Sequence, residues 1–158
     1  MMNILPLLVF LLVVFVAAGS GALFSPGPWY KSLKRPSWTP PDWAFPVVWT
    51  ILYVMIAIAG WLVWKAQGFG PALAVWGVNI VVNALWSYFM FGRKNIALAL
   101  ADVALLWLLT AAFIVIASGV DKTAGWLFVP YLVWVSIASA LNFEVWRLNR
   151  GAVATSGG

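Results

Sequence analysis

Five long apolar stretches, separated by short polar breaks, constrain this chain more than any other feature. They run over residues 4–24, 42–64, 71–91, 96–117 and 123–147. A bilayer core about 30 Å thick needs roughly 20 apolar residues per helix, because an α-helix rises about 1.5 Å per residue. Each stretch is long enough to cross it. We therefore predict an all-α integral membrane protein, a five-transmembrane-helix bundle.

Composition argues against a soluble fold. Of the 158 residues, 65% are hydrophobic and only 8% are charged, whereas soluble domains carry about 25% charged residues. So few charges cannot cover a water-facing surface of this size. The five spans use nearly the whole chain, so we expect a single membrane domain over residues 1–150 and a disordered tail over residues 151–158.

The absence of two residue types narrows the chemistry. The chain has no Cys and no His, so it lacks thiolate nucleophiles, disulfides and the imidazole ligands typical of many metal sites. We expect no metal site and no required cofactor. The net charge of +5 would suit nucleic acid, but the basic residues lie singly or in pairs between apolar stretches. That pattern sets membrane topology instead.

The basic residues also predict how the helices are oriented. With five spans, seven of the nine fall on one side of the membrane and two on the other. The richer side holds Lys31, Lys34, Arg35, Arg93, Lys94, Arg147 and Arg150. Positive-inside logic places this side, with the long loop and the C-terminus, in the cytoplasm of a plasma-membrane protein.

A Pro- and Trp-rich loop, residues 25–41, joins the first two spans. It holds five of the nine prolines, so we expect no regular helix there. Its aromatic residues Trp29, Tyr30 and Trp38 suit a headgroup interface or a folded lid. Asp42, at the end of this loop, is a candidate N-cap for the second span.

Aromatic and amide side chains recur at helical spacing within three spans. Residues four apart share one face of a helix. Such faces hold Phe45, Trp49 and Tyr53 in the second span, Trp76, Asn79, Asn83 and Trp86 in the third, and Tyr131, Trp134, Ala138, Leu141 and Asn142 in the fifth. These faces either pack together, with amides bonded to backbone carbonyls across helices, or line a cavity for a flat apolar ligand. We predict a cavity beneath the loop.

Two acidic residues have predicted roles. Asp102 lies within the fourth span, where charge is costly. We expect it to contact Arg93, Arg147 or an indole, and a proton relay is the alternative. Glu144 precedes Arg147 by three residues, which predicts an ion pair on one helix face.

Three motifs occur in order along the chain. They are PSWTPPDWAFPVVWTILY at residues 36–53, NALW at 83–86 followed by Phe91-Gly92, and PYLVW at 130–134 followed by LNFEVWR at 141–147. Together they resemble the TspO/MBR family, which includes the tryptophan-rich sensory proteins of bacteria and the mitochondrial translocator protein, or peripheral benzodiazepine receptor. The resemblance covers about residues 5–150.

The resemblance implies a five-helix bundle, usually a homodimer, that binds tetrapyrroles such as protoporphyrin IX and, in some members, cholesterol and benzodiazepine-type drugs. Carried over by motif, the ligand-binding residues are Trp38, Phe45, Trp49, Tyr53, Asn83, Trp86, Trp134, Ala138 and Leu141. Some bacterial members are reported to promote light-dependent porphyrin breakdown, for which Trp49 and Trp134 would be the reactive pair. The family's sterol motif falls on Leu141, Phe143 and Arg147, with Phe143 where the motif has Tyr.

One function and two alternatives follow. We expect a membrane protein that binds porphyrins, and sterol-like ligands, as a sensor, scavenger or transporter, with Lys31, Lys34 and Arg35 attracting acidic groups of the ligand. The first alternative is enzyme-like, light-dependent porphyrin degradation, although no general acid–base pair is evident. The second is proton-coupled export through Asp102.

We expect a bacterial protein of the plasma or outer membrane, with lipid, a flat apolar molecule and a second copy of the chain as partners.

Overall fold

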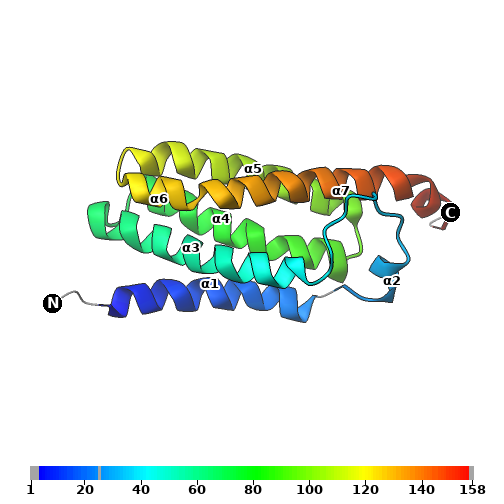
Figure 1. Ribbon diagram of the computed structural model, residues 1–158, viewed down its shortest axis with the longest axis horizontal. Coiled ribbons are helices and arrows are strands. Elements are labelled where there is room, and N and C mark those ends of the chain that lie inside the picture. Colours follow the sequence, from blue (N-terminus) through cyan, green and yellow to red (C-terminus); the bar gives the residue numbers. More distant parts are fainter. Residues whose placement is uncertain (1–3, 25, 157–158) are drawn as a thin grey trace.

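The computed structural model describes residues 4–24 and 26–156, which form a bundle of helices (Figure 1). The helices in chain order are α1 Leu5–Leu23, α2 Pro28–Lys31, α3 Ala44–Gln67, α4 Pro71–Ser87, the π-helical turn η1 Tyr88–Gly92, α5 Ile96–Ser118, α6 Lys122–Leu127 and α7 Val129–Ser156. Within the described residues, five helical segments are long and apolar enough to cross a membrane, one for each predicted span. The predicted five-span, all-α membrane architecture is confirmed.

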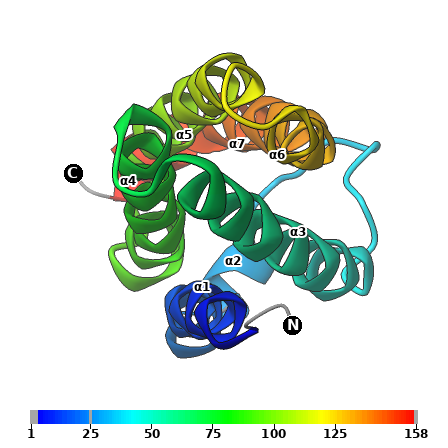
Figure 2. The same ribbon diagram turned by 90° about the vertical axis from the view of Figure 1, so that its left-hand side faces the viewer.

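The bundle has two distinct ends. α2 and the C-terminal end of α7 lie at one end, which we call the loop end, and α1 begins at the other, the far end (Figure 1). Seen from the far end, α1 packs beside α3 and α4, α4 beside α5, and α5 beside α6 and α7 (Figure 2). The long loop and the end of α7 therefore share one end of the bundle.

The far half of the bundle is a sealed core. The rings of Phe113 and Phe128 lie with centroids 4.0 Å apart, and neither residue is exposed. Gly60 of α3 leaves space for the indole of Trp76, since a Cβ on Gly60 would lie only 2.5 Å from that ring. Trp76 Nε1 donates a hydrogen bond of 2.9 Å to the carbonyl oxygen of Ile56. Close packing and hydrogen bonds of this kind hold helices together in lipid, which is as apolar as the side chains.

A second, smaller cluster attaches the loop to the bundle at the loop end. Its buried members are Met90, Ile96, Ala99, Leu141 and Val145. Trp29 and Tyr30 of the loop pack against this cluster, and the Tyr30 ring meets the Phe91 ring edge to face at 5.4 Å. The loop is thus folded onto the helices. It also contains the short helix α2, contrary to our expectation; Pro28 is tolerated there because the first helical position needs no N–H.

The start of α3 corrects a second expectation. Asp42 does not cap this helix: α3 begins at Ala44, with Trp43 at the N-cap position and no side-chain hydrogen bond to the helix end. The main chain supplies a bond instead, as the Ala44 N–H donates to the carbonyl oxygen of Pro41 at 2.9 Å. This donor at the helix start is therefore satisfied without a carboxylate.

The fifth span is interrupted, whereas we expected one continuous helix over residues 123–147. α6 ends at Leu127, and α7 begins after a turn at Phe128. Pro130 accounts for the break, because proline has no N–H to donate to the carbonyl four residues earlier. The Phe128 N–H donates to the Gly125 carbonyl oxygen at 3.2 Å, which tightens the turn.

The C-terminal end of α7 lies beyond the expected domain boundary. The helix continues to Ser156, past the boundary that we expected at residue 150. Residues 157 and 158 of the expected tail lie outside the described residues.

Candidate functional site

A cavity of about 620 Å³ lies in the loop-side half of the bundle. All five spans and the loop contribute to its walls. Eight of the nine residues that the motifs suggested line it: Phe45, Trp49, Tyr53, Asn83, Trp86, Trp134, Ala138 and Leu141. The ninth, Trp38, is not part of this lining and is 48% exposed. Side chains from three separate motifs thus converge on one space.

The aromatic walls meet mostly edge to face. Trp49 and Trp134 lie with ring centroids 6.5 Å apart and their planes at 86°, and Phe45 meets Trp134 at 5.6 Å. Trp49 also stacks on Tyr53, its neighbour one turn along α3, at 5.4 Å. Edge-to-face contact is a preferred arrangement of aromatic pairs and fixes how these rings are oriented. They leave flat apolar surfaces facing the cavity.

A chain of side-chain hydrogen bonds starts at the cavity and continues into the core. Asn83 Nδ2 donates to the Tyr131 hydroxyl at 2.8 Å, and that hydroxyl donates to Asn79 Oδ1 at 2.9 Å. Asn79 Nδ2 in turn donates to Thr110 Oγ1 at 2.9 Å. Only one N–H of the Asn83 amide is used in the bond to Tyr131, so its other N–H and its amide oxygen are left for a ligand. The two amides of α4 bond other side chains, whereas the Asn142 amide of α7 bonds a backbone carbonyl oxygen across helices, as we expected.

The two deeper indoles of α4 and α7 differ in their hydrogen bonding. Trp86 Nε1 donates to Asn142 Oδ1 at 2.9 Å, and Asn142 Nδ2 reaches the Ile96 carbonyl oxygen at 3.3 Å. Trp86 is therefore fixed from both α7 and α5. Trp134 Nε1 is buried and has no hydrogen-bond partner among the described residues. A buried donor without a partner is costly, and this one belongs to a residue that lines the cavity.

Charged residues of the loop complete the cavity wall. Lys31, Arg35 and Asp42 line it, and the Arg35 guanidinium lies 5.2 Å from the centre of the Tyr30 ring. Lys34, the third predicted cation, is not part of the lining. The loop and Asp42, which directly follows it, thus contribute two cations and one carboxylate to a mostly apolar cavity.

Some lining residues were not predicted from the sequence. Phe15, Ala18 and Gly21 of α1 line the cavity, as do Val103 and Leu106 of α5. These two helices carry no aromatic or amide stripe in their cavity-lining parts, so nothing in the sequence marked those faces. Only the packing of α1 against α3 and α4, and of α5 against α4 and α7, identifies these residues.

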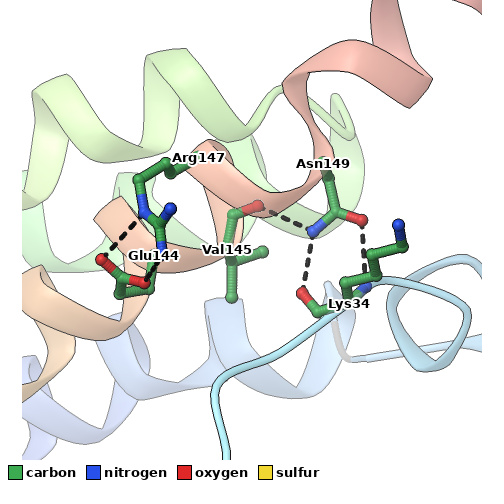
Figure 3. Close-up of polar contacts among 5 residues, drawn as sticks. All are labelled: Lys34, Glu144, Val145, Arg147 and Asn149. Carbon is green, nitrogen blue, oxygen red and sulfur yellow. Dashed lines mark hydrogen bonds and ion pairs between the residues drawn. The ribbon is translucent and has the colours of Figure 1, made fainter.

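Asp102 lies apart from the cavity lining. It is 7% exposed, and its Oδ2 has no hydrogen-bond partner among the described residues. Arg147, which we expected as one possible partner, pairs instead with Glu144 at 2.6 Å (Figure 3). The predicted Glu144–Arg147 ion pair is thus present, whereas the predicted Asp102–arginine contact is not found among the described residues.

The three residues of the sterol motif do not converge. Leu141 is buried and lines the cavity, whereas Phe143 is 45% exposed. Two residues apart on a helix point to nearly opposite faces. Arg147 is exposed and engaged with Glu144. A ligand in the cavity would meet only the first of the three.

Metal-binding side chains are sparse in this molecule. In the part of the chain that the structure describes, no group of three or more His, Cys, Asp or Glu residues is placed to hold a metal ion. The cavity offers aromatic surface, the amides of Asn83 and Asn142, the unpartnered indole N–H of Trp134 and a few charges at the loop.

The chain is similar in sequence to one protein family and to several named proteins. A family model described as the TspO/MBR family matches residues 8–147. The chain is 46% identical over 139 residues to "Protein CrtK" of Rhodobacter capsulatus, covering 85% of this chain and 87% of the relative. It is 44% identical over 142 residues to the "Tryptophan-rich sensory protein" of Cereibacter sphaeroides, covering 90% of each. It is 35% identical over 128 residues to the human "Translocator protein", covering 78% of this chain and 76% of the relative.

Proposed function

Since this chain belongs to the TspO/MBR family of membrane proteins, we propose that it binds porphyrins in the cavity of its loop-side half. Relatives carry the names tryptophan-rich sensory protein and translocator protein. Sensing a ligand and moving it across a membrane share one step, which is binding. Binding is therefore the activity that we assign, as the basis of a sensing, scavenging or transport role.

The observation that carries the proposal is the convergence of Trp49, Trp86 and Trp134 on one cavity of about 620 Å³. Ligand cavities in proteins are typically about 300–1,000 Å³ and mostly apolar, with few polar groups that fix orientation. Flat indole faces suit a flat conjugated ring, because stacked and edge-to-face contacts are favourable. A porphyrin macrocycle is a ligand of this shape and chemistry.

The polar groups of the cavity support an acidic, nitrogen-containing ligand. Lys31 and Arg35 line the cavity at the loop, where they can pair with the carboxylates of a porphyrin. Asn83 presents an amide oxygen to a donor such as a pyrrole N–H, and Trp134 Nε1 presents an unpartnered donor. A porphyrin macrocycle with carboxylates at one edge would contact the cations at the loop with that edge and the polar groups of Asn83 and Trp134 with its ring.

A titration of protoporphyrin IX into the protein in lipid nanodiscs tests the proposal. Saturable binding with a shift in porphyrin absorbance is expected for the natural sequence. A Trp49→Ala, Trp134→Ala double variant should bind at least about tenfold more weakly, equal to about 1.4 kcal/mol. Trp126→Ala is the matched control, because Trp126 is 72% exposed and does not line the cavity. Equal affinity of the double variant and the control would refute the site.

Light-dependent porphyrin breakdown is a second candidate function. The observation in its favour is the near-perpendicular pair Trp49 and Trp134, at 6.5 Å, of which Trp134 has an N–H without a partner. Such indoles are placed to react with a photoexcited ring and dioxygen. Illuminated samples should then lose porphyrin absorbance faster than dark samples, and Trp134→Phe should slow that loss while binding persists. Equal loss in light for protein-bound and free porphyrin would dismiss this function.

A further inference from the structure

The loop is a wall of the cavity as well as a connection between spans. Tyr30, Lys31 and Arg35 all lie between α1 and α3 in the chain, and all three line the cavity. Their positions therefore depend on where the loop main chain is held. Packing of Tyr30 on the loop-end cluster is one attachment. Close by lies a second attachment, which is polar.

Asn149 of α7 holds the loop by its main chain (Figure 3). Its Oδ1 accepts a hydrogen bond of 2.9 Å from the Lys34 N–H, and its Nδ2 donates one of 2.8 Å to the Lys34 carbonyl oxygen. The two residues are 115 positions apart in the chain. A side-chain amide here pairs with one residue of the loop in both directions, as a neighbouring strand would.

The amide is fixed on its own helix as well. Nδ2 of Asn149 donates a further hydrogen bond of 2.7 Å to the carbonyl oxygen of Val145, one turn earlier in α7. Both amide hydrogens are therefore used, and the residue is only 4% exposed. Among side chains of this length only asparagine offers one acceptor and two donors in a plane. An aspartate in its place has no N–H to donate.

The contact does not involve the side chain of Lys34. Only the N–H and carbonyl oxygen of that residue bond to Asn149, and the residue itself is exposed. Lys34 directly precedes Arg35 and follows Lys31 by three residues. The amide thus fixes the main chain between the two cations that line the cavity, whatever side chain stands at position 34.

We propose that Asn149 is a positioning residue for the ligand cavity: it holds the loop over the cavity and sets the places of Lys31 and Arg35. The ligand side of this inference rests on the proposed porphyrin binding, whereas the position of the loop does not. Without the two bonds the loop keeps its aromatic contacts but separates from α7 more often. A ligand then both enters and leaves more quickly.

The first test measures the loop without any ligand. Trypsin is added to the full chain in nanodiscs, and cleavage after Lys31 is followed by mass spectrometry; the bond after Arg35 precedes proline and resists trypsin. Asn149→Ala should be cleaved after Lys31 about tenfold faster than the natural sequence, the factor for about 1.4 kcal/mol. Asn149→Asp, which keeps the shape of the side chain but loses both donors, should be cleaved after Lys31 as fast as Asn149→Ala.

Lys34→Ala is the matched control, because it removes the ammonium group but keeps the bonded N–H and carbonyl oxygen. Cleavage after Lys31 should stay at the natural rate in this variant. Thermal unfolding midpoints of all the variants show whether the bundle itself is intact. Equal cleavage rates for the natural sequence and both Asn149 variants would overturn the positioning role.

The second test measures ligand exchange with protoporphyrin IX by stopped-flow absorbance. Asn149→Ala should raise the association and dissociation rate constants together, so that Kd changes less than either rate. Lys34→Arg, which keeps both the positive charge and the bonded main chain, should leave both rate constants near their natural values. If the natural protein binds no porphyrin while cleavage still rises in Asn149→Ala, the proposed function fails and the positioning of the loop stands. If the natural protein binds and the Asn149 variants alter neither cleavage nor exchange, the positioning role fails alone.

Discussion

The two halves of this bundle use aromatic residues to opposite effect. In the far half, Phe113 and Phe128 lie 4.0 Å apart, and the indole of Trp76 occupies the space beside Gly60. In the loop-side half, Trp49 and Trp134 meet edge to face at 6.5 Å around about 620 Å³ of space. What differs is the neighbour of each ring. In the far half neighbouring side chains fill the space around each ring, whereas in the loop-side half the indoles of Trp49 and Trp134 border open space.

The border between the halves is polar. Asn83 lines the cavity, and the hydrogen bonds that begin there pass through Tyr131 and Asn79 to Thr110. Tyr131, Asn79 and Thr110 are fully buried and do not line the cavity. This chain joins α4, α7 and α5 at the floor of the cavity. It can hold the helices apart there without leaving polar groups unpaired.

The largest expected difference between the halves is in stability. Phe113→Ala removes a fully buried ring from the sealed half and should lower the free energy of unfolding by about 3–5 kcal/mol. Trp49→Ala should cost clearly less, because Trp49 already borders open space. Reversible unfolding in mixed micelles measures both. A loss for Trp49→Ala as large as that for Phe113→Ala would erase the distinction between the halves.

Two glycine substitutions sharpen the comparison. A Cβ on Gly60 would lie 2.5 Å from the Trp76 ring, whereas a Cβ on Gly77 would meet nothing within 4 Å. Gly60→Ala should therefore destabilise the protein by about 1–3 kcal/mol, as overpacking does. Gly77→Ala should leave stability unchanged or raise it, since alanine favours helix. Equal unfolding midpoints for the two variants would contradict close packing in the far half.

The smallest expected change concerns the polar border. Tyr131→Phe removes the hydroxyl that links Asn83 to Asn79, and side-chain hydrogen bonds within membranes contribute about 0.6 kcal/mol on average, up to about 1.7. We expect a loss of stability in that range and weaker protoporphyrin binding, because the Asn83 amide is no longer held. Chemical unfolding and the porphyrin titration measure the two effects. Unchanged values in both would show that the border does not support the cavity.

Much of this architecture could be predicted from the sequence, since bilayer thickness fixes helix length and spacing fixes helix faces. The stripe of Phe45, Trp49 and Tyr53 indicated a cavity face because aromatic residues four apart must share a side. The contribution of α1 could not be predicted, because a helix that is apolar all round gives no sign of which face points inward. Only the packing of α1 against α3 and α4 decides which of its faces points into the bundle.

Two further features depended on contacts between distant residues. The attachment of the loop by Asn149 joins residues 115 positions apart, and one asparagine near a helix end gives no sign of its partner. Trp38 belongs to the same motif as Trp49, yet it lies outside the cavity lining. Trp38 lies in a segment without regular secondary structure. The spacing of residues there does not predict which way a side chain points.

The most direct test of the central claim is to fill the cavity and measure porphyrin affinity. Ala138 of α7 lines the cavity, whereas Ala140, two residues later, is exposed on the outside of the same helix. Protoporphyrin IX titrations of Ala138→Phe and Ala140→Phe in nanodiscs compare the two faces. If the loop-side half holds the ligand, Ala138→Phe weakens binding by at least about tenfold and Ala140→Phe leaves it unchanged. Full affinity in Ala138→Phe, with the bundle intact by thermal unfolding, would contradict the account.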